Sequence, residues 1–125
     1  MVASLNNIYC YTMSTSSYAS SNLLQTISLN NGNGVLDLSS DGLLIAYVNN
    51  QSNLSIATGW PGSYTTVQTI ITNSTIRGVV VSEEKWLLLI VSGDSQILLY
   101  ANNTNNFTFV ASYSIDGKIE KIDLA

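Results

Sequence analysis

The sequence lacks histidine altogether, and its 125 residues include only one cysteine and one proline. Without histidine, Ser-His-Asp and Cys-His nucleophilic systems cannot form within the chain, and histidine-based metal sites are excluded. The single cysteine, Cys10, cannot form an internal disulfide, and we expect it to be a small apolar residue on a strand. These absences predict a protein that is not an enzyme and that has no catalytic residue, no metal site and no cofactor.

Charged residues are also scarce, at 10% of the chain, with a net charge of −4. Nucleic-acid binding requires clustered basic residues, and the four that are present (Arg77, Lys85, Lys118 and Lys121) form no cluster. We therefore expect no nucleic-acid partner. The polar surface must come from asparagine, serine and threonine, which favours an extracellular or cell-surface protein.

Long apolar runs are missing as well. The longest, Trp86 to Val91, is far shorter than the roughly 20 residues that cross a bilayer, so no membrane span is expected. The first residues show no basic segment followed by an apolar one, so no secretory signal is expected either. The chain is then either cytoplasmic, which is the alternative localisation, or a mature or excised piece of a longer protein.

An internal repeat is the strongest positive signal. The segment SSDGLLIAYV, which starts at Ser39, has a counterpart SEEKWLLLIV that starts 43 residues later at Ser82. Sliding the chain by the same offset also places Gln25-Thr26-Ile27 on Gln68-Thr69-Ile70 and Leu44 on Leu87. A unit of 40 to 45 residues is the size of one propeller blade.

Each unit is predicted to contain four short strands. In the copy over residues 76–118, they are Ile76 to Ser82, Trp86 to Ser92, Gln96 to Ala101 and Asn106 to Ser114. The second strand is apolar throughout, which predicts burial on both faces, with Trp86 and residues 87–91 at the centre of the unit. Truncating Leu88 or Leu89 to alanine should then cost about 2–5 kcal/mol. The fourth strand alternates and should be half exposed.

These units divide the single segment 1–125 into four parts. Residues 1–33 form a partial unit with the third and fourth strands, 34–75 and 76–118 form complete units, and 119–125 form the first strand of a following unit. Such a segment has incomplete ends with unpaired strand edges. We therefore expect it to be part of a longer chain, or to assemble with other copies of itself into a ring or filament.

At VLDLSSDGLLIAYV and LLIVSGDSQILLYA, the chain resembles the divergent WD40-like or YVTN-like β-propeller repeat family. Asp41-Gly42 matches the tight turn, Asp94 the structural aspartate and Tyr100 the usual tryptophan, whereas Gln51 replaces the aspartate in the preceding copy. No Gly-His or Trp-Asp pair occurs. The resemblance implies an all-β fold of four-stranded antiparallel blades of about 43 residues, in an incomplete propeller of just under three blades. It does not specify a function.

Candidate acidic residues are Asp37, Asp41, Glu83 and Glu84. Asp41 and Glu84 occupy equivalent turn positions, where a carboxylate usually bonds its own backbone, so we expect solvated turns there. The segment NNGNG at residues 30–34 resembles a phosphate loop but precedes a predicted strand and not a helix, which removes the reason for anion binding.

Trp60, in the segment TGWPGSY that ends at Tyr64, is a candidate for stacking on a sugar or another flat ligand. The equivalent segment of the next copy has no aromatic residue at the Trp60 position. Because a repeated lectin would present its aromatic residue in several units, we favour a loop in which Trp60 packs over its own unit. Trp60 and Tyr64 remain the candidate ligand contacts.

Five asparagines begin an Asn-x-Ser/Thr sequence and are candidate N-glycosylation sites: Asn50, Asn53, Asn73, Asn102 and Asn106. All fall in or beside predicted turns, and Asn73, Asn102 and Asn106 are expected to have the most room. The sequence thus predicts a non-enzymatic structural or protein-interaction scaffold, extracellular and carrying N-linked glycans. The alternative is a carbohydrate-binding or ligand-binding propeller that uses the loop aromatic residues.

Overall fold

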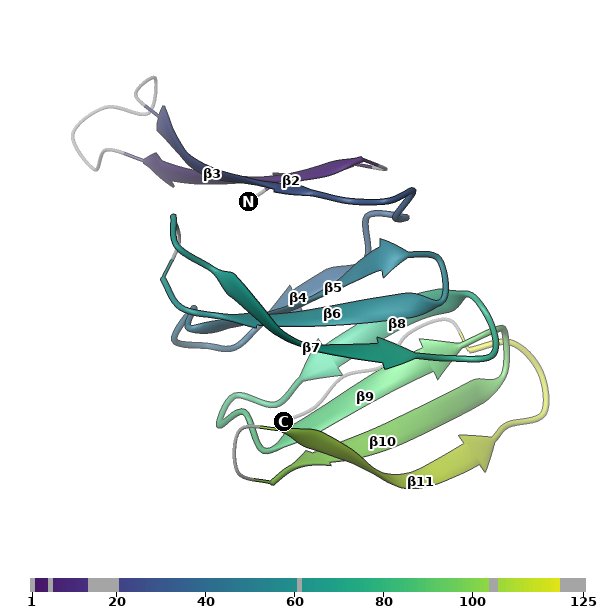
Figure 1. Ribbon diagram of the computed structural model, residues 1–125. Helices are drawn as coiled ribbons and strands as arrows, with labels where there is room; N and C mark the ends of the chain where they lie inside the picture. The colour runs from purple at the N-terminus through teal and green to yellow at the C-terminus, as the bar shows by residue number, and fades with distance from the viewer. Residues whose placement is uncertain (1, 5, 14–20, 61, 104–105, 120–125) are drawn as a thin grey trace.

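The computed structural model describes residues 2–4, 6–13, 21–60, 62–103 and 106–119. These residues form eleven β-strands and no helix, which confirms the prediction of an all-β fold. Figure 1 shows the strands gathered into three sheets that lie one above another. The described residues contain no helix that is long and apolar enough to cross a membrane.

Every sheet is antiparallel and pairs strands in chain order. The first sheet comprises β1 (Val2–Ala3), β2 (Asn7–Met13) and β3 (Ser21–Ser28); the second β4 (Leu36–Leu38), β5 (Leu44–Asn50), β6 (Asn53–Thr58) and β7 (Thr65–Ile71); the third β8 (Ile76–Val81), β9 (Leu87–Ser92), β10 (Gln96–Asn102) and β11 (Phe107–Ser114). The four strands of the third sheet agree with the predicted ones to within a residue at each end.

The strand registers show that the second and third sheets are two copies of one unit. Leu44 pairs with Thr58 in the second sheet. In the third sheet Leu87 pairs with Ala101, and both of these residues lie one 43-residue repeat after the first pair. A β-bulge interrupts the pairing of the third and fourth strands at Ile56/Ala57 and again at Leu99/Tyr100. The first sheet carries a bulge at Cys10/Tyr11, between β2 and β3.

The N-terminal part of the chain has one strand more than was predicted. The partial unit at residues 1–33 contains β1 in addition to the two expected strands, because the two-residue segment Val2–Ala3 pairs with β2. A two-residue strand is too short to leave a periodic signal in the sequence. The strand expected at 119–125 lies, except for Ile119, outside the described residues.

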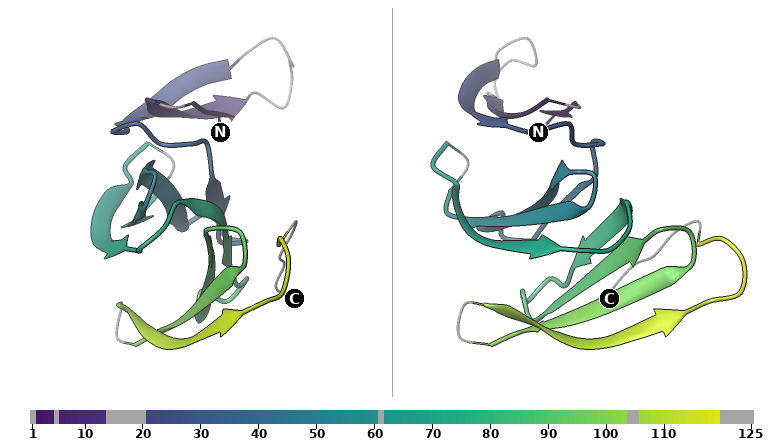
Figure 2. Two further views of the ribbon diagram at one scale, coloured as in Figure 1. Left: turned by 90° about the vertical axis from the view of Figure 1, so that its right-hand side faces the viewer. Right: turned by 45° about the vertical axis from the view of Figure 1, so that its right-hand side comes forward.

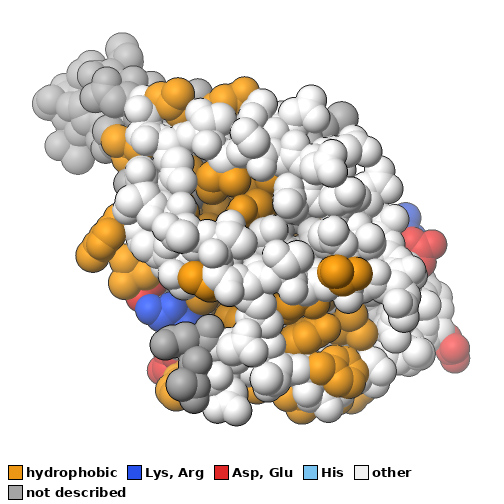
Figure 3. Space-filling model, in the orientation of Figure 1, with side chains coloured by type: hydrophobic (Ala, Val, Ile, Leu, Met, Phe, Trp, Pro, Cys, Tyr) orange, Lys and Arg blue, Asp and Glu red, His pale blue; other side chains and the backbone are white. Residues whose placement is uncertain are grey.

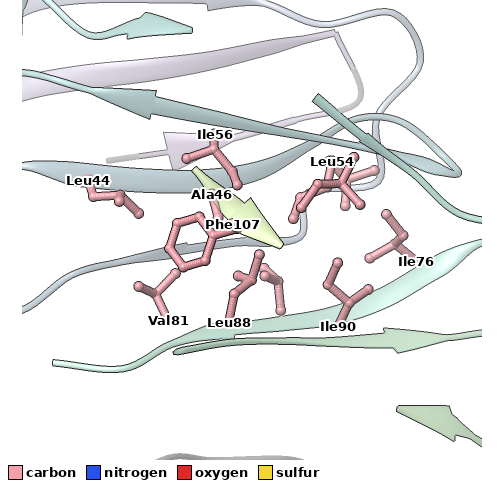
Figure 4. Packing of buried hydrophobic residues seen from close by; sticks show 12 residues of the cluster. Leu44, Ala46, Leu54, Ile56, Ile76, Val81, Leu88, Ile90 and Phe107 are labelled. Carbon is pink, nitrogen blue, oxygen red and sulfur yellow. The ribbon is translucent and has the colours of Figure 1, made fainter. Parts of the chain in front are cut away.

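Two hydrophobic clusters hold the sheets together. The larger fills the space between the second and third sheets, where Ala46 and Ile56 face Leu88 and Ile90 (Figure 4). The smaller lies between the first and second sheets and includes the buried Cys10. Figure 2 shows from two further directions that the sheets form one open row, and that the described residues do not close into a ring.

The inner and outer strands differ in burial. The residues Leu44 to Val48 of β5 are all buried, as predicted for a second strand with both faces covered. The fourth strands are more exposed than the expected half, since only Ile70 of β7 and Phe107 of β11 are buried. These strands lie at the outer edge of each sheet, and only their buried residues pack into the cluster between the second and third sheets.

Candidate functional site

A groove opens at one end of the junction between the second and third sheets, where the loops β6–β7 and β8–β9 lie. We call it the end groove. Its volume is about 580 Å³, which is within the range of small-ligand sites. Along the left edge of the molecule in Figure 3, hydrophobic side chains stand out beside acidic and basic ones. Most residues of the groove fall into three groups: two exposed indoles, a charged turn and an apolar floor.

Trp60 supplies the first indole from the loop between β6 and β7, and 68% of it is exposed. The loop begins at Gly59, whose φ is +132° and where a Cβ would lie 2.7 Å from the Ser63 carbonyl oxygen, so glycine is required. The Ser63 amide donates a hydrogen bond of 2.8 Å to the Trp60 carbonyl and closes the turn. The preferred expectation that Trp60 packs over its own unit was therefore wrong, because its ring faces solvent.

Trp86 supplies the second indole from the residue that precedes β9, and it is 62% exposed. Sequence analysis placed Trp86 at the buried centre of the third sheet, and this expectation was wrong. The apolar run begins before the strand does, so Trp86 lies in the turn that enters β9, where its amide bonds the Ser82 hydroxyl at 3.1 Å. One feature of the sequence could have predicted this exposure: Trp86 is the first residue of the apolar run and directly follows the polar turn 83–85.

Lys85 occupies a backbone conformation that is unusual for a residue with a side chain. Its φ is +64°, whereas the equivalent residue of the second sheet, Gly42, has φ +73°. Gly42 confirms the predicted tight turn. A left-handed non-glycine residue costs of order 1–3 kcal/mol and often marks a functional position. Lys85 uses this conformation at the rim of the end groove, where its ammonium lies 2.6 Å from a carboxylate oxygen of Asp41.

The ion pair links the same turn of two consecutive sheets. Asp41 also accepts hydrogen bonds from the Ser39 hydroxyl at 2.7 Å and from the Leu43 amide at 3.0 Å, as expected for a turn aspartate. The bond from Lys85, followed by those from Ser39 and Leu43, lowers the pKa of Asp41 well below its ordinary value. The positive charge of Lys85 is therefore matched across the pH range in which proteins normally work.

Replacing Lys85 with methionine should raise the pKa of Asp41 toward about 3.9, the ordinary value of an aspartate side chain. Because the native pKa is depressed, the stability that Asp41 contributes is present above the unfolded-state pKa and is lost as the pH falls through the native one. A carboxyl-carbon NMR titration of the folded protein compares the pKa of Asp41 in the wild type with that in Lys85→Met. Lys118→Met, in an exposed loop, is the control and should leave Asp41 unchanged. Identical Asp41 titrations in the wild type and in Lys85→Met would contradict the assignment.

The floor of the end groove is made by Leu44, Ile56 and Phe107, all of them buried. Gln68, from β7, fixes Phe107 in place across the junction: its amide nitrogen donates to the Phe107 carbonyl at 2.7 Å, and its oxygen accepts from the Phe107 amide at 2.8 Å. We call this two-bond contact a glutamine clamp. It positions the start of β11 under the two indoles.

A second glutamine clamp, one repeat earlier, accounts for Tyr64. The Gln25 side chain donates to the Tyr64 carbonyl at 3.0 Å and accepts from the Tyr64 amide at 2.9 Å. The Tyr64 hydroxyl donates to the Gly42 carbonyl at 2.6 Å, and burial raises its pKa. Tyr64 is buried, so its candidate role as a ligand contact is not supported: its polar atoms are engaged within the protein.

Asn102, at the end of β10, also lines the end groove. Its side-chain nitrogen donates to the Lys85 carbonyl at 3.1 Å, while its buried side-chain oxygen has no hydrogen-bond partner among the described residues. Asn102 was expected to lie in a loop with enough space for a glycan. The residue is instead half-buried, and the nitrogen to which a glycan would be attached is hydrogen-bonded.

The other candidate glycosylation sites lie at both ends of the sheets. Asn73 and Asn106 are exposed in loops, whereas Asn50 and Asn53 are half-buried and pair with each other across the β5–β6 turn. The structure thus brings Asn102 and Trp60 to one groove but leaves the remaining candidates apart.

The acidic candidates do not gather into one metal-binding group among the described residues. Asp37 accepts a hydrogen bond of 2.8 Å from the Val81 amide of the next sheet, and Asp94 pairs with Arg77 at 2.8 Å. Glu83 and Glu84 are exposed in the turn before β9. Among the described residues there is no group of three or more histidine, cysteine, aspartate or glutamate side chains that could hold a metal ion.

Comparison with known proteins gives a likeness of fold. No family model and no curated protein matches the chain. Two solved structures are similar: a protein of unknown function from Desulfotomaculum acetoxidans (TM-score 0.72, 17% identity) and a protein from Bacteroides uniformis provisionally named a 6-phosphogluconolactonase (TM-score 0.69, 15% identity). The matches cover 92% and 89% of this chain but only 37% and 36% of those structures.

The second likeness corrects the expectation that the protein is not an enzyme. A protein with a similar fold bears the name of an enzyme, so the fold does not exclude catalysis. The inference failed because the lack of histidine excludes only certain reactions, and only for groups that this chain itself supplies. The matched region is about a third of the enzyme-named protein, and the remainder of such a protein supplies further side chains.

Proposed function

We propose that the three sheets are consecutive blades of a β-propeller and that the end groove binds a small ligand. The 43-residue repeat, the four antiparallel strands of the second and third sheets and the likeness to larger propeller-like structures support the first part. The observation that carries the second is the pair of exposed indoles, Trp60 and Trp86, on one groove. Exposed tryptophans beside a concave apolar surface are suited to stacking on a flat ligand, a carbohydrate ring included.

The chain also has features of an interaction scaffold, and these concern the uncovered flank of the third sheet. In the second sheet, one face of β5 and β6 is buried against the third sheet. The equivalent face of the third sheet is equally apolar, and no strand of the described residues packs against it. Its residues Leu87, Leu89, Ile97 and Leu99 occupy the positions of Leu44, Ala46, Leu54 and Ile56.

A further blade, from the remainder of a longer chain or from a second copy, would cover this flank as the third sheet covers the second. The protein would then serve as a scaffold within a larger chain, ring or filament. Exposed Asn73 and Asn106 are the sites best placed for N-linked glycans, in keeping with an extracellular or cell-surface location.

The two tryptophans provide a direct test of the groove. They are the only ones in the chain, so the two indole N–H signals in an NMR spectrum are assigned by Trp60→Phe and Trp86→Phe. Screening a small-molecule fragment library should find compounds that move both signals together, with affinities weakened about tenfold by Trp86→Ala. Tyr113→Ala, an exposed aromatic residue on β11, is the control. A library that binds elsewhere and never moves both indoles would refute the site.

A further inference from the structure

We infer that the ligand of the end groove is an organic cation, such as a quaternary or methylated ammonium group. This inference rests on the proposed function, since it assumes that the groove binds a ligand, and it adds the chemical class. The supporting observations are the charges that line the groove and the two exposed indoles.

The charge of the groove is negative once its internal ion pair is counted. Two charged residues line it, Glu84 and Lys85. Lys85 is matched by Asp41 at 2.6 Å, which leaves Glu84 as the groove's own unmatched charge. The ion pairs among the described residues are Lys85–Asp41 and Arg77–Asp94, so neither includes Glu84. Glu84 is exposed and borders the same space as the indole of Trp86.

An anionic ligand does not suit this arrangement. A phosphate or carboxylate would require Lys85 to leave Asp41, and would then approach both Asp41 and Glu84. Arg77 is at the opposite end of the third sheet, where β8 begins, and Lys118 follows β11 at that same end, next to Ile119, which bonds the β9–β10 turn. Among the described residues, no second basic side chain lines the groove, so an anion would lack the paired cations that normally hold it.

A cation gains from both kinds of lining. The face of an indole attracts a cation within about 6 Å of its centroid, and tryptophan is the most effective aromatic residue in this respect. The carboxylate of Glu84 adds direct attraction at the same rim. The side-chain oxygen of Asn102 in the groove wall is itself buried, so it adds only the dipole of its amide and no direct contact. A neutral sugar would use the indole faces, but would leave the charge of Glu84 unused.

The ammonium can belong to a free small molecule or to a methylated lysine in a peptide, because the chemistry at the groove is the same. A comparison of choline with a short peptide that contains trimethyllysine separates these sources. Tighter binding of the peptide would indicate that chain atoms beyond the ammonium also contact the groove, and equal binding would indicate a free cation.

The experiment compares choline with its uncharged isostere, in which carbon replaces the nitrogen, by following the two indole N–H signals. Choline should bind about fivefold more tightly than the isostere. Glu84→Gln should remove most of that preference. Glu83→Gln, in the same turn but outside the groove lining, should leave it intact. Methyl glucoside and inorganic phosphate are the neutral polar and anionic probes.

The outcomes separate the two proposals. Equal binding of choline and its isostere, tighter binding of methyl glucoside or of phosphate, or a preference that survives Glu84→Gln overturns the cation while the groove remains a ligand site. The cation is also overturned if the fragment screen finds ligands of the groove but choline moves neither indole signal. If neither the fragments nor the probes move the indoles, the proposed function itself is wrong.

Discussion

Truncating Leu88 to alanine should lower the free energy of unfolding by about 2–5 kcal/mol, as for other large-to-small changes in a packed core. Leu88 has no exposed surface. In Figure 4 it lies between Val81 and Ile90 on the third sheet and points toward Ala46 of the second. Because both sheets are held by hydrogen bonds within themselves, they cannot move together to fill the void. Denaturant unfolding monitored by circular dichroism measures the loss.

Leu89→Ala is the matched control for this experiment. Leu89 is the next residue of the same strand, with the same side chain, but it is half-buried on the uncovered flank. Its truncation should cost less than half as much as that of Leu88. Equal losses at the two positions would mean that the flank is covered in solution or that the core is misplaced. Sequence analysis treated the two leucines alike, because it expected both faces of β9 to be covered.

The Gln68→Leu change should destabilise the protein by about 2–6 kcal/mol, because it leaves two backbone groups of the buried Phe107 without partners, at about 1–3 kcal/mol for each group. Leucine preserves much of the volume of glutamine, so the loss reports the clamp and not a cavity. Thermal and denaturant melts measure it. If the variant also shifts the NMR signals of the Trp60 and Trp86 indole N–H groups, the clamp affects the geometry of the end groove as well.

Two further variants define the clamp. Gln25→Leu removes the equivalent bonds to Tyr64 and should cost a similar amount, because the geometry of the two clamps is nearly the same. Gln51→Leu, at an exposed turn, should change stability by less than about 0.5 kcal/mol. A Gln68→Leu protein as stable as Gln51→Leu would show that water replaces the clamp at no cost.

The repeat made most of the fold predictable. The strands of the third sheet, the left-handed Gly42 and the equivalence of Leu44 with Leu87 followed from an offset in the sequence and from the apolar pattern within each unit. Burial followed less well. Leu44 is 5% exposed and Leu87 is 37% exposed, although their pairing is equivalent, because within the described part of the chain a sheet packs against Leu44 and none packs against Leu87. Local pattern determines the register, whereas burial depends on what lies beyond the unit.

The end groove could not be predicted from the sequence for the same reason. Trp60 and Trp86 occupy different positions within their units, so the repeat does not relate them. They meet because the third-to-fourth-strand loop of one sheet lies beside the first turn of the next. In the sequence, the only sign of the glutamine clamps was that Gln25 and Gln68 are the same residue at equivalent positions of the repeat. That identity shows a shared environment, but it does not show that the side chain reaches the neighbouring sheet.

The bulge between third and fourth strands has a consequence for the geometry of the whole stack. An extra residue bends its strand and increases the local right-handed twist, so the outer strand of each sheet turns away from the plane of the strands inside it. At Ile56/Ala57 and Leu99/Tyr100 the bend falls at equivalent points, and the Cys10/Tyr11 bulge lies between the last two strands of the first sheet. Sheets that bend alike at one edge can stay in contact there, whereas a flat outer strand would separate from a bent neighbour. We therefore expect the shared bulge to help each outer strand follow the neighbouring sheet.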